Sequence, residues 1–253
     1  MSYRCCFEEN YVKTTLNRSK PRDLAVIDTD GIDQAIISAA VERGVFIYGY
    51  INAAALENGR TYYGSLKHLR LARYEGWSGE YWIDPTAQEW KRHIVDLAKT
   101  IKETGAIGAY LDNTDLYGYI RDREIKKQYG RDLPTASSVY KALSDIVLEL
   151  HKIGLIVMPN GGDIFTKKFI TEHPGIIATI NQEGVFYENF KKQSPSETAY
   201  RKNWCEWAKK HISGKVRIID YCKKPAEIAA VRTYCLAHGW DCYISKHTDL
   251  RGD

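Results

Sequence analysis

Two carboxylic acids in this 253-residue chain stand where acid–base chemistry is possible. Asp112 follows the apolar run at residues 107–111, and Glu183 follows the apolar run at residues 176–180. Each acid is therefore expected at the carboxyl end of a buried strand, where the chain reaches solvent. Two carboxyl groups facing each other across a sugar are what glycoside hydrolysis needs, because one protonates the leaving oxygen while the other attacks the anomeric carbon or activates water. Taken alone, Asp112 also fits a helix cap or turn, and Glu183 fits a salt bridge to a loop lysine.

A second pair of acids, Asp28 and Asp30, follows the apolar run at residues 24–27. Residues two apart on a strand point to the same face, so a continuing strand would place two negative charges together. Such a pair favours a cation or a shared proton. Asp30 with Gly31 equally fits a turn that caps the next helix.

The elements that must position these acids alternate along the chain. Eight short apolar runs read as buried strands, at residues 3–7, 24–27, 45–51, 107–111, 155–158, 176–180, 216–219 and 241–244. Helical patterns lie between them, at residues 31–43, 90–104, 137–152, 164–173, 197–212 and 226–238. Eight repeats of strand and helix predict an α/β fold, a single (β/α)8 TIM barrel over residues 1–253. The first connection, residues 12–22, is expected to hold only a helical turn. The connection after the third strand, residues 52–106, is a long insertion over the barrel mouth.

Active sites of such barrels are built at the carboxyl ends of the strands. Every predicted strand here is followed by a polar residue, among them Glu8, Asp28, Asn52, Asp112, Asn160, Asn181, Asp220 and Lys246. Carboxylates or amides after nearly all strands predict a site for a polar ligand. The 18 tyrosines and 6 tryptophans beside only 6 phenylalanines suit a sugar, because these rings offer an apolar face with a polar edge.

The charge distribution and the apolar runs exclude some classes of partner and bear on the location of the protein. The net charge of +4 is spread over interspersed charges without a basic block, so no nucleic-acid partner is expected. The apolar runs are too short to cross a bilayer. No apolar region precedes the first acids, so we expect a signal peptide to be absent or already removed, with a cytoplasmic location in the first case and secretion in the second.

The sequence also lacks the usual signals of bound metals and cofactors. The six cysteines form no C-x-x-C pair and are expected to be mostly buried thiols. The seven histidines show no metal-ligand spacing, and no glycine-rich phosphate-binding motif is present. We therefore expect neither a metal nor a cofactor.

Five segments together resemble glycoside hydrolase family 114, the endo-α-1,4-polygalactosaminidase-like barrels. They are residues 50–63 (YINAAALENGRTYY), 77–84 (WSGEYWID) with Trp90 behind, 110–117 (YLDNTDLY), 159–163 (PNGGD) and 181–187 (NQEGVFY). Their order and spacing cover residues 3 to 250. Many relatives carry Gly-Glu shortly after the third strand, whereas this chain places its acid later, at Glu57.

The resemblance implies a glycosidase acting on α-1,4-linked galactosamine-containing polymers. Asp112 would be the nucleophile and Glu183 the general acid/base of a retaining double displacement, which predicts a carboxyl separation of about 5 to 5.5 Å. Asp28, Asp30, Glu57 and Asp115 would supply negative charge to a protonated 2-amino group, while Trp77 and Tyr81 would offer stacking faces. The other expected substrate-binding residues are Asn52, Arg60, Asn113, Tyr117, Asn160, Asp163, Gln182, Tyr187 and Tyr221.

Three alternatives stand beside this prediction. The first is a carbohydrate-binding barrel without catalysis, which would keep Trp77 and Tyr81 but tolerate loss of either carboxylate. The second is a glycosidase of the same fold acting on a different amino-sugar glycan. The third is a metabolic barrel enzyme for a phosphorylated ligand, which would want backbone-donor glycines after the last two strands. We expect a monomer whose partner is a carbohydrate polymer or oligosaccharide, with no nucleic acid or membrane.

Overall fold

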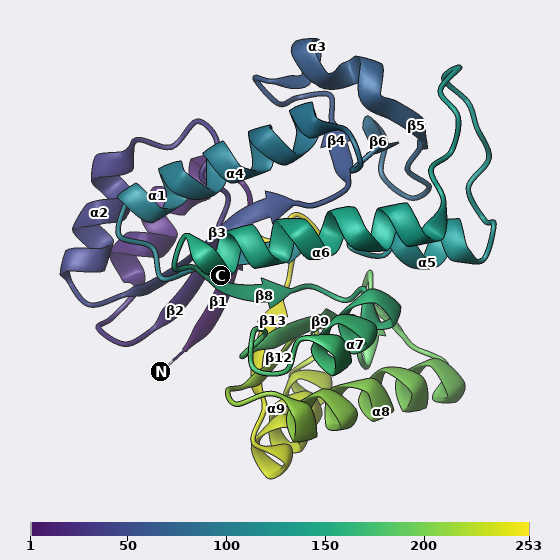
Figure 1. The fold of residues 1–253 in the computed structure, drawn as a ribbon. Coiled ribbons are helices and arrows are strands. Elements are labelled where there is room, and N and C mark those ends of the chain that lie inside the picture. The colour runs from purple at the N-terminus through teal and green to yellow at the C-terminus, as the bar shows by residue number, and fades with distance from the viewer. Residues whose placement is uncertain (1, 253) are drawn as a thin grey trace.

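The computed structural model describes residues 2–252 and folds them as a (β/α)8 barrel (Figure 1). Five parallel strands form one sheet in the order β1-β2-β3-β7-β8: Tyr3–Cys6, Leu24–Ile27, Phe46–Asn52, Gly108–Asp112 and Ile156–Pro159. The other three barrel strands pair in the order β9-β12-β13: Ile180–Glu183, Val216–Tyr221 and Asp241–Ser245. The predicted alternation of eight strands with helices is confirmed.

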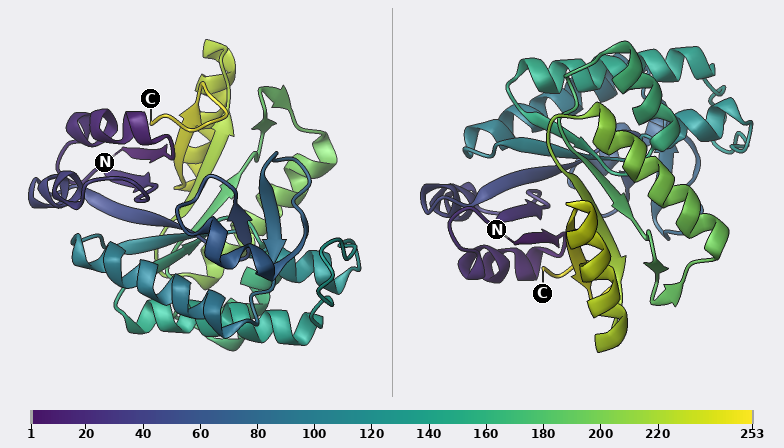
Figure 2. Two further views of the ribbon diagram at one scale, coloured as in Figure 1. Left: turned by 90° about the horizontal axis from the view of Figure 1, so that it is seen from above. Right: turned by 90° about the horizontal axis from the view of Figure 1, so that it is seen from below.

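Two contacts join these sheets into a barrel. A parallel bridge between Asn160 and Asn181 connects the end of β8 to β9. On the other side β13 lies beside β1, and the chain end returns there, where the Phe7 backbone N–H donates to the Leu250 carbonyl at 2.9 Å. The strands therefore enclose one interior, with the helices outside it (Figure 2).

The helices cover the outer face of the barrel. They are α1 (Glu9–Arg18), α2 (Gln34–Glu42), α4 (Gln88–Glu103), α5 (Leu116–Arg121), α6 (Ala136–Lys152), α7 (Asp163–Glu172), α8 (Pro195–His211) and α9 (Pro225–His238). The first connection holds a ten-residue helix, so the prediction of a single turn was wrong; Val12, Thr15 and Leu16 supply its buried face. None of the helices described in residues 2–252 is long and apolar enough to cross a membrane.

The long insertion after β3 is a small antiparallel sheet. It contains β4 (Ala55–Glu57), α3 (Tyr63–Leu66), the 3-10 turn η1 (Lys67–Leu69), β5 (Arg70–Arg73) and β6 (Glu80–Ile83), with strand order β4-β6-β5. A second short hairpin follows β9, formed by β10 (Tyr187–Glu188) and β11 (Lys191–Lys192). Both additions follow strands at their carboxyl ends, so they build up the same rim of the barrel.

Two apolar clusters reflect the alternation of side chains along the strands. One fills the barrel interior with Tyr3, Cys5, Leu24, Val26, Tyr48, Tyr110, Met158, Ile219, Tyr221 and Tyr243. The other lies between strands and helices, where Gly49 on β3 lets Ile101 of α4 approach so closely that a Cβ atom would meet it at 2.7 Å. Five of the interior residues are tyrosines, which explains part of the tyrosine excess. All six cysteines are free thiols and five are buried, as predicted.

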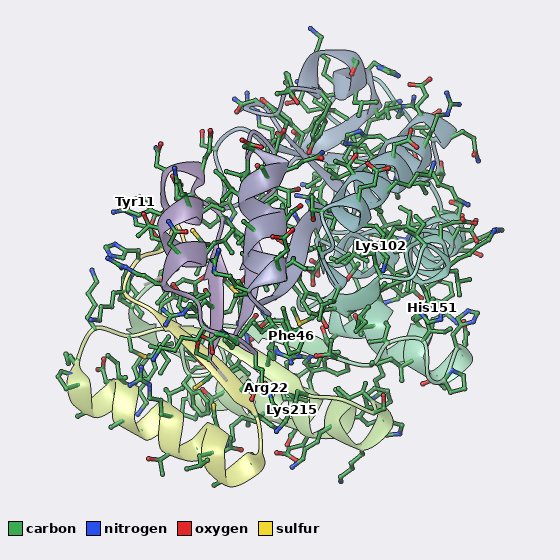
Figure 3. The ribbon with its side chains drawn as sticks, turned by 90° about the vertical axis from the view of Figure 1, so that its left-hand side faces the viewer. Tyr11, Arg22, Phe46, Lys102, His151 and Lys215 are labelled. Carbon is green, nitrogen blue, oxygen red and sulfur yellow. The ribbon has the colours of Figure 1, made fainter. Side chains whose placement is uncertain are left out.

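The end of the barrel where the strands begin carries no predicted site residue. Figure 3 shows Arg22, Phe46 and Lys215 there, close to the points from which β2, β3 and β12 start. The predicted site residues follow the other ends of the strands.

Candidate active site

Residues two apart on a strand point to the same side, so the residue at the end of several strands points into the barrel mouth, as the interior residue two positions earlier does. Asp112 follows the interior residue Tyr110 by two positions on β7, and Asn160 follows Met158 in the same way after β8. On β9, Glu183 and Asn181 share one face. The predicted strand at residues 176–180 was displaced by several residues, because β9 runs from Ile180 to Glu183. Glu183 is therefore the last residue of a strand and is held by its ladder.

One amide joins the two predicted catalytic acids. The Nδ2 atom of Asn160 donates to Asp112 Oδ1 at 3.0 Å and to Glu183 Oε1 at 2.9 Å. These distances set an upper limit of about 6 Å on the separation of the two carboxylate oxygens. Asn160 is buried, and it follows β8, which pairs with β7 on one side and lies beside β9 on the other. The order of the strands thus brings the two acids together.

A buried network beneath the acids fixes the orientation of that amide. Asn181 Nδ2 donates to Asn160 Oδ1 at 2.7 Å and to the Tyr110 hydroxyl at 3.0 Å, while its own Oδ1 accepts from the Tyr3 hydroxyl at 2.8 Å. Because Asn160 Oδ1 is the acceptor of one bond, its NH2 group must face the carboxylates. The interior tyrosines therefore position the site as well as fill the barrel.

Each acid has further donors of its own. Asp112 accepts from the Tyr50 hydroxyl at 3.2 Å and from the backbone N–H of Asn113 at 3.0 Å. Glu183 accepts from the Tyr221 hydroxyl at 2.8 Å and from the Tyr110 hydroxyl at 3.3 Å. No salt bridge to a loop lysine is formed by Glu183, and Asp112 does not cap a helix, among the residues described.

Arg201 of α8 holds the backbone where β9 ends. Its Nη1 atom donates to the carbonyl oxygens of Glu183 at 2.6 Å and Gly184 at 3.1 Å. Asp220 at the end of β12 anchors the following turn, because its Oδ1 accepts the backbone N–H groups of Phe186 and Tyr187 at 2.9 and 2.5 Å. The strand end that carries Glu183 is thus fixed from two sides.

Burial disfavours negative charge on this pair of acids. It raises the pKa of Asp112 to about 8, and the nearby Glu183 carboxylate adds to the effect. Burial also raises the pKa of Glu183, although the hydrogen bonds from Tyr221, Asn160 and Tyr110 oppose it. Two carboxyl groups so close together cannot both ionise readily, so the pair keeps one proton near neutral pH. One acid can then donate a proton while the other acts as a base or nucleophile.

A half-buried arginine, Arg60, lies among the acids Asp28, Asp30 and Glu57 beside the pair. Arg60 donates to Asp28 Oδ2 at 2.5 Å, makes two bonds of 2.9 Å to the Glu57 carboxylate, and lies 3.7 Å from Asp30 Oδ2. Its guanidinium also lies over the Tyr50 ring, 5.6 Å from the ring centre. The cation expected at Asp28 and Asp30 is therefore part of the protein. Asp33, not Asp30, caps α2.

The turn after β7 presents another acid. Asn113 adopts φ 60°, and the Asp115 carboxylate that follows accepts the backbone N–H of Gly162 at 3.0 Å. Gly162 is required here, because a Cβ atom would collide with the Thr114 hydroxyl. Burial raises the pKa of Asp115 to about 6, opposed by the Gly162 hydrogen bond. Asp115 is thus ionised at neutral pH within the barrel mouth.

These groups line a cleft of about 860 Å³ at the barrel mouth. Its acidic side chains are Glu8, Glu9, Asp28, Asp30, Glu57, Glu80, Asp112, Asp115, Glu183, Glu188 and Asp249. Among the described residues that line it, the basic ones are Arg60 and Arg201. Aromatic side chains complete the wall: Phe7, Tyr50, Tyr74, Trp77, Tyr119 and Tyr221. The cleft is therefore strongly acidic on a chain of net charge +4, with ring faces available to a sugar.

The structure brings most of the predicted site residues to this cleft. Those that line it are Asp28, Asp30, Glu57, Arg60, Trp77, Asp112, Asn113, Asp115, Asn160, Gln182, Glu183 and Tyr221. Five others do not line it. They are Asn52, Tyr81, Tyr117, Asp163 and Tyr187.

The five predicted residues that do not line the cleft make contacts elsewhere in the fold. Asn52 Oδ1 accepts the backbone N–H of Ala55 at 2.7 Å and so shapes the turn into β4. Tyr81 contacts Tyr63 and Tyr129, and Tyr117 packs against Tyr140 and Phe165 in the helical shell. Asp163 accepts from the Tyr200 hydroxyl, and Tyr187 pairs with Lys192 in the β10–β11 hairpin.

Sequence reasoning gave no role in the site to Tyr50, Tyr110, Glu80 or Arg201, and it named Asn181 only as a polar residue that follows a strand. The first two stand two positions before Asn52 and Asp112, so strict alternation along the strand would have placed them on the inner face. Asn181 likewise stands two positions before Glu183, so the two side chains lie on the same face of the strand. Nothing in the local pattern indicates Arg201 or Glu80, because their places depend on how α8 and the insertion pack.

Comparisons with known proteins identify the family and the fold of the chain. The sequence model of glycoside-hydrolase family GH114 matches residues 2–245. A search of curated proteins gave no significant match. Among solved structures, the glycoside hydrolase domain of PelA from Pseudomonas aeruginosa gives a TM-score of 0.78 at 16% identity, covering 99% of this chain and 96% of that one.

Two further structures have the same fold. Ega3 from Aspergillus fumigatus in complex with galactosamine gives a TM-score of 0.72 at 13% identity, covering 98% of this chain and 92% of that one. An α-galactosidase from Thermus thermophilus in complex with p-nitrophenyl α-D-galactopyranoside gives 0.62 at 12% identity, covering 95% of this chain and 57% of that one. At these identities the likeness shows the fold alone. The family match over nearly the whole chain shows more: this protein is a glycoside hydrolase and belongs to family GH114.

Proposed function

We propose that this glycoside hydrolase cleaves α-1,4-linked galactosamine-containing polysaccharides or oligosaccharides by a retaining mechanism. The observation that carries the proposal is the single Asn160 amide that bonds both Asp112 and Glu183. Retaining enzymes hold their two carboxyl groups about 5 to 5.5 Å apart, whereas inverting enzymes leave about 6.5 to 9.5 Å for a water molecule. The upper limit of about 6 Å between Asp112 Oδ1 and Glu183 Oε1 supports direct attack by one of them.

The mechanism assigns one role to each acid. In the first step an Asp112 oxygen forms a bond to the anomeric carbon, the glycosidic C–O bond breaks, and Glu183 gives its proton to the leaving oxygen. In the second step Glu183 takes a proton from water, and that water oxygen replaces Asp112 on the anomeric carbon. Asn160 donates to both acids throughout. This order returns to Glu183 the one proton that the pair holds near neutral pH and leaves Asp112 ionised, as before the first step.

The choice of substrate rests on two supports. The GH114 family match and the fold shared with Ega3, which was solved with galactosamine, point to an amino sugar. The excess of acidic side chains in the cleft suits a sugar whose 2-amino group is protonated. Exposed Trp77 at the rim provides a ring for a sugar farther along the chain.

Hydrolysis of purified α-1,4-galactosamine oligomers tests the proposal, with release of reducing ends as the readout. Wild type should cleave them, while Asp112→Asn and Glu183→Gln should each lose about 10³-fold or more of kcat. Asp122→Asn is the matched control, since this exposed acid pairs with Arg121 away from the cleft. A wild-type protein that binds but does not cleave would instead be a carbohydrate-binding barrel. Cleavage of another amino-sugar glycan alone would overturn the substrate and keep the chemistry.

A further inference from the structure

The insertion after β3 places two glutamates directly opposite each other at the cleft. Glu57 of β4 and Glu80 of β6 are cross-strand partners in the antiparallel sheet, and both line the cleft. Figure 1 shows β4 and β6 within the insertion. Like charges in such a position destabilise a sheet. The pair therefore needs at least one positive partner.

The structure supplies that partner to only one of the two. Arg60 makes two hydrogen bonds to the Glu57 carboxylate. Within the described part of the chain, the Glu80 carboxylate accepts no hydrogen bond and forms no ion pair. Its backbone is nevertheless fixed, because its carbonyl accepts the Tyr74 N–H at 3.0 Å and the Gly79 carbonyl accepts the Asn58 N–H at 2.9 Å.

The position of Glu80 disfavours the ionised form of its carboxyl group. Burial raises its pKa to about 7, the negative charge of Glu57 adds to the rise, and only Arg60 opposes it. The charge of Glu80 also raises the pKa of Tyr50 and Tyr74, the same two tyrosines whose pKa Asp112 raises. Glu80 and Asp112 thus act on one region of the cleft. A cation placed there would relieve the unpaired carboxylate.

The same hairpin offers a surface for a sugar ring. Trp77 lies in the loop between β5 and β6, three residues before Glu80, and is 55% exposed while lining the cleft. Stacking on an aromatic face orients a sugar without charge. A carboxylate beside it distinguishes a protonated amine from a neutral amide, because only the amine gives a charge-assisted hydrogen bond.

We propose that Glu80 is a specificity-determining residue that binds the ammonium group of an amino sugar held in the cleft beside Trp77. The other acids near the insertion are not available to bind the ammonium group, because Asp28, Asp30 and Glu57 are already paired with Arg60. This inference rests on the proposed function and refines its substrate. Selection of free amino groups over acetylated ones then depends on the Glu80 carboxylate.

The test compares Glu80→Gln with Glu75→Gln, both made in an Asp112→Asn background that prevents turnover. Glu75 lies on the same loop but is exposed and does not line the cleft, so it controls for loss of one negative charge. Isothermal titration measures the affinity for α-1,4-galactosamine oligomers and for their N-acetylated forms of equal length. Thermal unfolding of each variant confirms that it is folded.

The expected result is a loss of about 10- to 100-fold in affinity for the amino oligomer with Glu80→Gln, and less than about twofold with Glu75→Gln. Affinity for the acetylated oligomer should stay unchanged, or stay undetectable if it is so at the start. Equal losses for both oligomers, or no loss for the amino form, would overturn the role of Glu80. Failure of the proposed function is a separate result, namely that wild type hydrolyses neither oligomer.

Discussion

Asp112 and Glu183 accept hydrogen bonds from one and the same nitrogen, the side-chain amide of Asn160. This relationship exists because β8 lies between β7 and β9, so the residue that follows β8 sits between the last residues of its neighbours. Asn181 below sets the direction of the amide by donating to its oxygen. The spacing of the two acids is therefore a property of the barrel interior.

Replacing the shared donor should damage catalysis more than folding. Asn160→Asp keeps the shape of the side chain but puts a third carboxyl group against Asp112 and Glu183. We expect kcat to fall by about 10²-fold or more, since neither acid retains its common donor. Asn203→Asp is the control, because it makes the same chemical change at an exposed position on α8. Equal activity of the two variants would show that the bridge has no catalytic role.

Neutralising Asp112 should stabilise the fold at alkaline pH. Burial and the nearby Glu183 carboxylate raise the pKa of Asp112 to about 8, so the native pair of acids keeps a proton that both carboxyl groups have lost in the unfolded state. Wild-type stability should therefore fall as the pH rises from about 4 to 8, and Asp112→Asn should avoid this loss. Urea denaturation should show Asp112→Asn more stable by roughly 1 to 3 kcal/mol at pH 8, with little difference at pH 4. A variant less stable than wild type at pH 8 would contradict the assigned cost of this charge.

The proton shared by the pair should be visible by titration. Carboxyl carbon NMR of labelled protein should show one step near pH 8 in wild type, where the pair loses its last proton. In Asp112→Asn the remaining Glu183 should titrate at lower pH, because the neighbouring negative charge is gone. Glu183→Gln should likewise lower the pKa of Asp112. A step near pH 8 that persists in both variants would belong to another group.

Arg60 should be essential to the stability of the cleft wall. Arg60→Met leaves Asp28 and Glu57 half-buried without their cation, and we expect a loss of about 3 to 5 kcal/mol at pH 7. Arg121→Met removes an exposed pair with Asp122 and should cost less than about 1 kcal/mol. Chemical denaturation measures both. Similar small losses would mean that the three acids near Arg60 are well solvated.

The barrel and the positions of the two proposed catalytic acids could be predicted because their signals are local. Buried strands give continuous apolar runs, and a strand that ends at a barrel mouth is followed by polar residues, which located Asp112 and Asn160. The boundary of β9 was missed by several residues, since Asn181 and Glu183 are polar residues inside a strand and break the apolar pattern. Their side chains face the polar network rather than the apolar core.

The charge pattern of the cleft could not be predicted from the strand ends. Arg60 lies in the insertion, and only the packing of that insertion on the barrel shows that it pairs with Asp28 across 32 residues of sequence. The same packing brings no described residue into a hydrogen bond or ion pair with the Glu80 carboxylate. Tyr81 and Tyr117 belong to sequence segments typical of the family, yet they pack away from the cleft. Successive side chains on a strand point to opposite faces, and successive side chains on a helix point in directions about 100° apart, so residues beside Tyr81 and Tyr117 can line the cleft while these two do not.

The anomeric configuration of the first product tests the retaining pair most directly. Proton NMR during cleavage of an α-1,4-galactosamine oligomer records the new reducing end before it mutarotates. Attack by Asp112 followed by attack of water inverts the anomeric carbon twice, so the account predicts that the α-anomer appears first and the β-anomer later. Initial appearance of the β-anomer would mean a single displacement by water and would contradict the role of Asp112 as nucleophile.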